Sequence, residues 1–236
     1  MAKISKPMLV AGKHPKSPMA EAYRTLRTNL SFAAVDQPVR TLLVTSAGPG
    51  EGKSTTISNL AVVLAQGGSQ VLLVDCDLRR PSQHKAFELD NSRGLTNALV
   101  EEINPEELIQ ATSVEGLGVL TTGPLPPNPA ELLGSERMKG LLSGLAAGFD
   151  YVLLDTPPAL AVTDAAVLAQ QVDGALLVAR AGVTRTDMLL EARELLARTG
   201  VRLLGAILNG IQPNGNSYYY YYYYYSDSAG QDETLD

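Results

Sequence analysis

Cysteine and histidine are scarce in this chain. Of its 236 residues one is a cysteine, Cys76, and two are histidines, His14 and His84. A single cysteine excludes a disulfide within the chain and fits a reducing compartment. One cysteine and two histidines are also too few for a four-ligand zinc site. We therefore expect Cys76 to be a small core residue without redox or zinc chemistry.

The sequence also lacks an apolar run of the roughly 20 residues that a membrane-spanning helix needs. Residues 1–17 contain lysines but no apolar segment typical of a secretory signal. The formal net charge of -6 gives no indication of a surface for nucleic acid. These absences predict a cytoplasmic protein that binds no nucleic acid and reaches a membrane only through a partner.

A central region, residues 38–212, alternates short apolar segments with longer helical ones. Strands that are apolar on both faces are typical of a sheet buried between two layers of helices. The expected strands are Thr41–Thr45, Val71–Val74, Val119–Leu120, Tyr151–Leu154, Ala175–Val178 and Leu203–Leu208. The expected helices are Ser54–Gln66, Pro129–Leu145, Asp164–Gln171 and Thr186–Thr199. The alternation predicts an α/β domain with a mostly parallel sheet and helices on both faces.

The N-terminal segment, residues 1–37, contains one expected helix. A serine followed by a proline predicts that the helix starts at Ser17. On this helix Glu21, Arg24 and Arg27 are spaced three residues apart and therefore share one stripe. The stripe is either a solvated face with one ion pair, worth about 0.3–0.5 kcal/mol, or a contact surface for another subunit.

The first strand is followed by a phosphate-binding loop, TSAGPGEGKST, which spans Thr45–Thr55. Glycines let the backbone N–H groups approach an anion closely, and the following helix presents its N-terminus to the phosphates. Lys53 would reach the β- and γ-phosphates of ATP, and the Ser54 hydroxyl would bind Mg²⁺. One departure from the usual pattern is Ala47, which replaces the first glycine. The expected nucleotide contacts in the loop are Gly48, Gly50, Glu51, Gly52, Lys53, Ser54 and Thr55.

Three aspartates lie at the ends of two further strands. Asp75 and Asp77 follow the second strand, and alternation along a strand would point them to the same side. Asp155 follows the strand Tyr151–Leu154, as in the Walker B pattern, whose aspartate holds the metal or its water. Ligands of open α/β sheets bind where such strands end. We expect Lys53, Asp75, Asp77 and Asp155 to be catalytic, and Ser54, Asp77 and Asp155 to hold the metal.

This set of motifs resembles the bacterial tyrosine kinases that regulate capsule and exopolysaccharide synthesis. The resemblance extends over residues 17–209 and the tail, and includes the apolar-Asp-x-Asp motif of Leu72–Asp77 and the loop and helix Gly123–Leu133. More distant relatives are the ATPases of plasmid partition and septum placement. Those proteins usually carry a second lysine at the position of Gly48, and its absence here favours the kinases.

The resemblance also assigns roles to residues outside the loop. It implies that Glu21, Arg24 and Arg27 contact the neighbouring subunit of a ring. Asn209 aligns with a position that often contacts adenine. The related kinases are activated by a transmembrane regulator of polysaccharide chain length, here a separate protein, which would recruit the chain to the inner face of the membrane. A tyrosine phosphatase would reset the cycle.

The C-terminal segment, residues 213–236, is polar and rich in tyrosine, which predicts a disordered tail. A flexible tether gives its phenols a high effective concentration at a neighbour's active site. In the related kinases such a tyrosine cluster is phosphorylated between subunits; alternatively, the run here is a repeat expansion or an introduced tract. The eight acceptors expected from the resemblance are Tyr218, Tyr219, Tyr220, Tyr221, Tyr222, Tyr223, Tyr224 and Tyr225.

Together these features predict a tyrosine autokinase that uses ATP and Mg²⁺. No HRD or DFG motif is present, so the chain is not a eukaryotic-type kinase. Asp75 is the first candidate for the base that accepts the tyrosine proton, although Asp75 and Asp77 could exchange roles. The alternative function is a partition- or septum-type ATPase, a nucleotide-switched assembly factor without kinase activity.

Overall fold

The computed structural model describes residues 9–34 and 37–211, whose strands form one seven-stranded sheet. The strand order is β3-β4-β2-β5-β1-β6-β7, and all neighbouring strands are parallel except β3 and β4. The strands are β1 (Thr41–Ser46), β2 (Val71–Asp75), β3 (Gln110–Ala111), β4 (Leu117–Leu120), β5 (Tyr151–Asp155), β6 (Gly174–Arg180) and β7 (Leu203–Asn209). The predicted α/β fold with a mostly parallel sheet is therefore confirmed.

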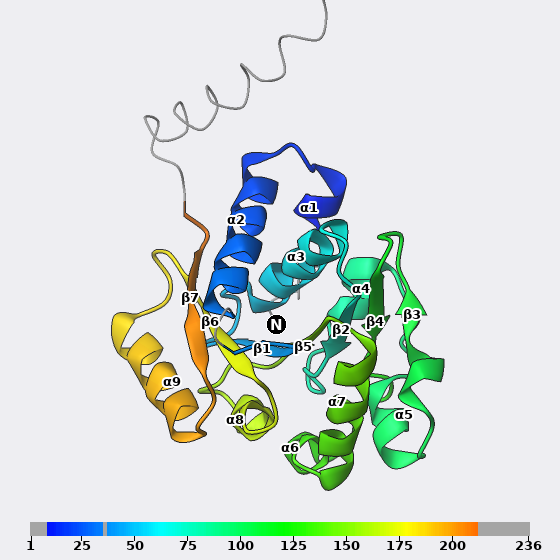
Figure 1. Ribbon diagram of the computed structural model, residues 1–236. Coiled ribbons are helices and arrows are strands. Elements are labelled where there is room, and N and C mark those ends of the chain that lie inside the picture. The colour runs from blue at the N-terminus through cyan, green and yellow to red at the C-terminus, as the bar shows by residue number, and fades with distance from the viewer. Residues whose placement is uncertain (1–8, 35–36, 212–236) are drawn as a thin grey trace, which may run out of the picture.

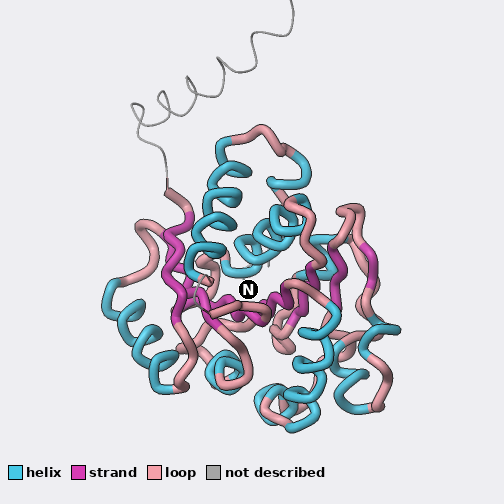
Figure 2. Tube along the Cα trace, viewed as in Figure 1, coloured by secondary structure: helices cyan, strands magenta, loops and turns pink. Residues whose placement is uncertain are grey.

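Helices cover both faces of this sheet (Figure 1). The helices are α1 (Val10–Lys13), α2 (Pro18–Ala33), α3 (Lys53–Gln66), α4 (Gln83–Phe87), α5 (Leu95–Val100), the 3₁₀ helix η1 (Pro105–Leu108), α6 (Pro129–Leu133), α7 (Glu136–Gly148), α8 (Asp164–Ala169) and α9 (Thr186–Arg198). In Figure 2 the strands lie as a central layer between the two groups of helices.

Two hydrophobic clusters, one on each face, hold the layers together. Along β1, Leu42 and Val44 belong to the cluster that contains α1, α2 and α3, whereas Leu43 belongs to the cluster under α7, α8 and α9. The side chains of Leu42, Leu43 and Val44 are all fully buried. Burial on both sides explains why this strand is a continuous apolar run without polar alternation.

Helix α2 starts where the sequence predicts, because the Ser17 hydroxyl accepts a hydrogen bond from the backbone N–H of Ala20 (3.2 Å) and Pro18 occupies the first turn. Its apolar side, including the buried Ala20 and Leu30, lies in the same cluster as α3. Helix α3 in turn lies against the sheet, so α2 is anchored to the element that begins at the phosphate-binding loop.

The predicted helix Pro129–Leu145 is wrong in one respect, because two helices, α6 and α7, replace it. The break falls at Gly134 and Ser135, where the Ser135 hydroxyl accepts from the N–H of Met138 (3.2 Å) and starts a new helix. The sequence analysis also missed α1, α4, α5, η1 and β3. These elements span only two to six residues, too few for a periodic pattern.

Two further expectations concern the membrane and the tail. Within the described ranges, no helix combines the length and the apolar character that crossing a bilayer requires. The tail that is predicted to be disordered, with its eight tyrosines, lies outside the described residues.

Candidate functional site: a phosphate-binding loop facing three aspartates

The phosphate-binding loop connects β1 to α3 and is shaped by two glycines. Gly50 has φ +77° and Gly52 has φ +97°, a left-handed region that glycine enters at little cost. A Cβ atom on Gly52 would lie 1.9 Å from the amide nitrogen of Asn209, so a larger residue would collide. Helix α3 has no side-chain cap at its N-terminus. The loop and the uncapped helix end therefore suit an anion such as a phosphate.

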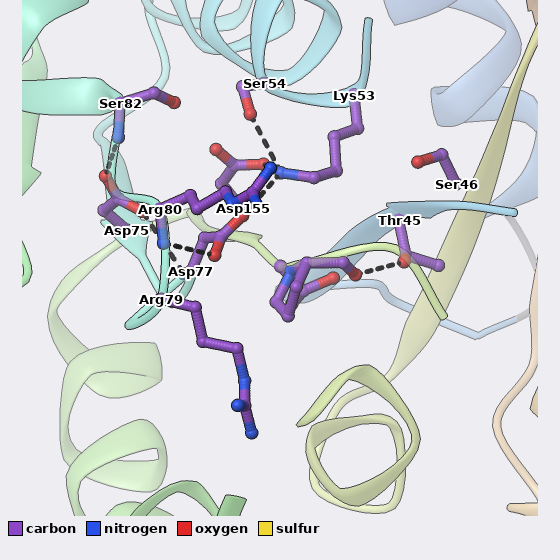
Figure 3. Close-up of polar contacts among 12 residues, drawn as sticks. Thr45, Ser46, Lys53, Ser54, Asp75, Asp77, Arg79, Arg80, Ser82 and Asp155 are labelled. Carbon is purple, nitrogen blue, oxygen red and sulfur yellow. Dashed lines mark hydrogen bonds and ion pairs between the residues drawn. The ribbon is translucent and has the colours of Figure 1, made fainter. Parts of the chain in front are cut away.

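Lys53, the first residue of α3, points to the aspartates at the carboxyl ends of two strands (Figure 3). Its Nζ lies 3.0 Å from Oδ2 of Asp77, 3.5 Å from Oδ1 of Asp155 and 3.1 Å from Oγ of Ser54. Burial opposes the charge of Lys53, but the attraction of Asp155 and Asp77 outweighs it and raises the lysine pKa. The structure thus brings together the lysine, the serine and two of the three predicted aspartates.

Asp75 and Asp155 occupy matching positions on the neighbouring strands β2 and β5, and both are completely buried. Burial and, after it, the nearby charge of Asp155 raise the pKa of Asp75 to about 7. The hydrogen bonds from the N–H groups of Gln83 and Ser82 lower this pKa, but they do not offset the rise. Burial also raises the pKa of Asp155, although the charge of Lys53 and the Gln83 hydrogen bond act in the opposite direction. Two carboxyl groups this close cannot both ionise without cost.

Asp75 and Asp77, which strand alternation was expected to point to the same side, have different partners. Strand β2 ends at Asp75, so the alternation does not reach Asp77. Asp75 accepts hydrogen bonds from the N–H groups of Ser82 and Gln83 (both 2.9 Å), whereas Asp77 faces Lys53 and accepts from the N–H of Arg80 (3.0 Å). Asp75 therefore holds the following loop, and Asp77 lies beside Lys53.

The oxygen atoms around Lys53 match what Mg²⁺ requires. The hydroxyl of Ser54 and the carboxylates of Asp77 and Asp155 are hard oxygen donors, the type that Mg²⁺ prefers. They come from α3, from the end of β2 and from the end of β5, and they meet at one edge of the sheet. The donor set is consistent with the predicted metal ligands.

The rest of the loop is supported from β6 and β7. The Arg180 guanidinium donates to the carbonyl of Gly50 (3.0 Å), and the Asn209 amide donates to the carbonyl of Glu51 (3.1 Å). Glu51 is 5% exposed, and its Oε2 has no hydrogen-bond partner among the described residues. Its other carboxylate oxygen would lie 3.3 Å from a Cβ on Gly48. Asn209 thus lies beside the phosphate-binding loop and bonds to its backbone.

Sequence reasoning missed Arg180 and a buried glutamine, Gln83. Gln83 is fully buried and donates through Nε2 to Oδ2 of Asp155 (2.7 Å). A further pair, Arg79 and Asp164, joins the loop after β2 to the start of α8 through two hydrogen bonds of 2.9 and 3.0 Å. Arg180 ends β6 and Asp164 begins α8, and this position was their only signal in the sequence, whereas Gln83 begins α4, a helix that the sequence did not predict.

The stripe on α2 that is predicted to contact another subunit is partly exposed. Its arginines bond to a carboxylate and to backbone carbonyls. Arg24 forms an ion pair with Glu21 at 2.7 Å and, at the surface, donates to the carbonyl of Pro15 (2.5 Å). Arg27 instead donates to the carbonyl of Val63 near the end of α3 (2.8 Å), so its guanidinium also holds α2 on the domain. Phe32, further along α2, is 70% exposed.

Comparisons with known proteins agree with this geometry. The pattern of the AAA domain family AAA_31 matches residues 39–179. The chain is 50% identical to the tyrosine-protein kinase YwqD of Bacillus subtilis over 202 residues, which are 86% of this chain and 85% of that protein. The kinase domain of the Escherichia coli tyrosine kinase ETK is 39% identical with a TM-score of 0.83, covering 88% of this chain and 82% of that one.

A more distant likeness is to the cell division ATPase MinD of Pyrococcus furiosus, at 27% identity and a TM-score of 0.63, over 72% of this chain and 71% of that one. Both kinases are therefore more similar to this chain in sequence than MinD is, and the ETK kinase domain is also more similar to it in structure. The strand order, the lysine–aspartate site and this similarity lead to one conclusion: the chain belongs to the family of bacterial tyrosine-protein kinases with an AAA domain.

Proposed function

We propose that this chain transfers the γ-phosphoryl group of Mg·ATP to tyrosine hydroxyls, beginning with Tyr218–Tyr225 in the tail of a neighbouring copy. The observation that carries the proposal is the meeting of Lys53 with Asp77 and Asp155 at the N-terminus of α3, in a chain whose relatives are tyrosine kinases. By the resemblance to kinases of capsule and exopolysaccharide synthesis, the reaction would regulate the synthesis and export of such a polysaccharide.

The residues of the loop would bind and orient the nucleotide. Mg·ATP supplies the phosphoryl group and neutralises part of its charge. The N–H groups between Gly48 and Thr55 would face the phosphates, while Ser54, Asp77 and Asp155 would hold the metal or its waters. Lys53 would stabilise the negative charge that develops during transfer. Asn209 would contact the adenine from beside the loop.

The base that accepts the tyrosine proton is one of two aspartates. Asp75 is our first candidate, because its pKa, raised to about 7, lies close to that of an efficient general base near neutral pH. Asp77 is the second candidate, because it lies beside Lys53 and does not anchor the loop through Ser82 and Gln83. Free tyrosine has a pKa of about 10, so either carboxylate would act late in the transfer.

The partner that delivers a tail is a second copy of the chain, in a ring that uses Glu21, Arg24 and Arg27. Support comes from the partial exposure of this stripe and from the exposed Met19 and Phe32 on the same helix. A separate transmembrane regulator of chain length would activate the site and bring the chain to the inner face of the membrane. A tyrosine phosphatase would restore the unmodified tail.

Phosphorylation would also weaken this assembly. Each phosphotyrosine adds about -1.5 to -2 charges near neutral pH, on a chain whose formal charge is already -6. Repulsion between subunits should therefore grow with the number of modified tyrosines. If the fully phosphorylated protein stays assembled at low salt, where screening is weakest, this electrostatic switch is wrong.

The test compares the wild type with a chain truncated after Ser217, each incubated with Mg·ATP and analysed for phosphotyrosine. The truncated chain should bind ATP and remain associated but show almost no autophosphorylation. If it is modified as strongly as the wild type, the acceptors are Tyr23 or Tyr151, both of which are partly buried. If the wild type binds and hydrolyses ATP without forming phosphotyrosine, the alternative function of an assembly ATPase is favoured.

A further inference from the structure

Gln83, the first residue of α4, is a buried amide that contacts three parts of the site. Its Nε2 donates to Oδ2 of Asp155 at 2.7 Å, and its Oε1 accepts from the hydroxyl of Ser58 at 2.7 Å. Its backbone N–H donates to Oδ2 of Asp75 at 2.9 Å. The side chain is fully buried, so these protein groups, and not water, satisfy it.

The two oxygens of the Asp155 carboxylate have different partners. Oδ2 lies against Gln83, whereas Oδ1 lies 3.5 Å from Nζ of Lys53. An ionised carboxylate can only accept hydrogen bonds, so the amide nitrogen of Gln83 must face it. The amide oxygen then faces Ser58 in the second turn of α3. The orientation of one carboxylate is thus tied to the helix that begins at the phosphate-binding loop.

Gln83 is also connected to the other aspartate-bearing strand. Asp75, at the end of β2, holds the backbone of Ser82 and Gln83, and thereby fixes where α4 begins. Asp155 ends β5, the strand next to β2. One residue therefore joins the ends of two neighbouring strands to α3, and its bonds to Asp155, Ser58 and Asp75 are short and buried.

We propose that Gln83 is a positioning residue that holds Oδ2 of Asp155, so that Oδ1 stays directed to the metal and phosphate side of the site. The inference rests on the proposed function, because it assigns the Mg²⁺ ligation of that same site. Groups that orient a metal-binding side chain from behind typically change metal affinity by about 10–100-fold when they are removed. Without Gln83, Oδ2 of Asp155 would lose its donor and the carboxylate would be held only from the side of Lys53. The affinity for the metal would therefore fall more than the affinity for the nucleotide.

The experiment measures the affinity for a fluorescent ADP analogue in EDTA and the concentration of Mg²⁺ that enhances its binding by half. Gln83→Leu keeps most of the volume but removes the side-chain hydrogen bonds to Asp155 and Ser58 and the longer one to the carbonyl of Ser54 (3.4 Å). We expect the half-maximal Mg²⁺ concentration to rise by about 10-fold, and the affinity in EDTA to change by less than about 2-fold. The matched control is Gln171→Leu, since the side chain of Gln171 donates to the carbonyl of Leu133 (2.9 Å), outside the site.

Ser58→Ala is the second variant, and it keeps the inference testable if Gln83→Leu does not fold. It removes the partner of Oε1, together with the contact of the Ser58 hydroxyl with the carbonyl of Ser54 (2.6 Å), and leaves the contact between Gln83 and Asp155 in place. We expect a smaller rise in the half-maximal Mg²⁺ concentration, in the same direction. Circular dichroism and the unfolding temperature without ligand establish that each variant is folded.

Two outcomes would overturn the inference. One is a folded Gln83→Leu protein with the same half-maximal Mg²⁺ concentration as the wild type. The other is an equal loss of affinity with and without Mg²⁺, which indicates a purely structural role. The proposed kinase activity fails separately: a wild type that binds Mg·ADP normally but forms no phosphotyrosine would refute the kinase and leave the role of Gln83 intact.

Discussion

Two sets of charged residues in this molecule are built from similar side chains but lie in opposite environments. At the start of α3, the side chains of Lys53 and Asp77 are 12% and 6% exposed, and that of Asp155 is fully buried. On α2, Glu21 and Arg24 form an ion pair of 2.7 Å with side chains that are 30% and 32% exposed. A short distance between opposite charges is therefore common to both sets, and burial is what separates them.

The difference in burial changes what each ion pair can do. A buried charge that loses its partner is costly, because neither water nor another group replaces the interaction. The lysine and the two aspartates therefore hold one another in place before any ligand arrives. A half-exposed pair contributes about 0–1 kcal/mol, because water competes with it. The ion pair between Glu21 and Arg24 on α2 therefore costs little to separate.

The largest expected effect comes from removing the cation of the buried set. Lys53→Met should abolish phosphotyrosine formation, since the phosphoryl group loses its main positive contact; removing one such stabilising group typically costs about 10²–10³ in rate. The measurement is phosphotyrosine analysis after incubation with labelled ATP. Persistent phosphotyrosine in a pure preparation would exclude this loop as the catalytic site.

A matched control for this change is Lys139→Met on α7, at an exposed position outside the site. The control should retain wild-type activity. Equal losses in both variants would show that the assay detects a general effect of losing a lysine and not the function of the loop.

The second prediction concerns pH and the buried Asp75. Its folded pKa of about 7 lies above the reference value of 3.8, so its contribution to stability is present at low pH and is lost as pH rises toward and through about 7. Asp75→Asn should remove this loss, and the unliganded variant should lose less stability than the wild type between about pH 5 and pH 8. Each pKa unit corresponds to about 1.4 kcal/mol.

Denaturant unfolding at the two pH values measures this difference. The control is Asp173→Asn, because Asp173 also accepts backbone hydrogen bonds, from Arg40 and Thr41, but lies outside the site. An identical pH dependence for wild type and Asp75→Asn would show that Asp75 is ionised in the folded protein at both pH values.

The third prediction separates the two arginines of the stripe. Arg27→Ala should lower the free energy of unfolding by about 1 kcal/mol, because the carbonyl of Val63 loses its donor, and should also reduce assembly. Arg24→Ala should reduce assembly with a smaller loss of stability. Sedimentation with nucleotide and denaturant unfolding measure the two quantities. If neither variant changes the sedimentation coefficient where the wild type assembles, the stripe is not an interface.

The smallest expected effect is that of Glu21→Gln on the isolated chain. Losing the ion pair with Arg24 should change stability by no more than about 0.5 kcal/mol, and less at high salt. Denaturant unfolding at low and high salt measures it. A loss of several kcal/mol would mean that this pair behaves like the buried set, and the contrast between the two would fail.

The sheet, the loop and the aspartates that follow β2 and β5 were predictable because their sequence signals are local. A continuous apolar strand followed by glycines or by an aspartate is recognisable without knowing its neighbours. The break between α6 and α7 was harder, because Gly134 and Ser135 interrupt a pattern whose apolar spacing continues on both sides. The partners of Gln83 and Arg180 could not be predicted, since a buried amide and a strand-end arginine have no periodic signature.

By itself the sequence determined the α/β architecture, the phosphate-binding loop and the position of each aspartate at the end of a strand. These features depend on hydrophobic periodicity and glycine geometry, which act over a few residues. Only the tertiary structure decided that Asp77 faces Lys53 while Asp75 holds the next loop, and that Arg27 reaches α3 while Arg24 pairs with Glu21. The physical reason is that hydrogen-bond partners and burial arise from segments distant in the chain, which no local pattern specifies.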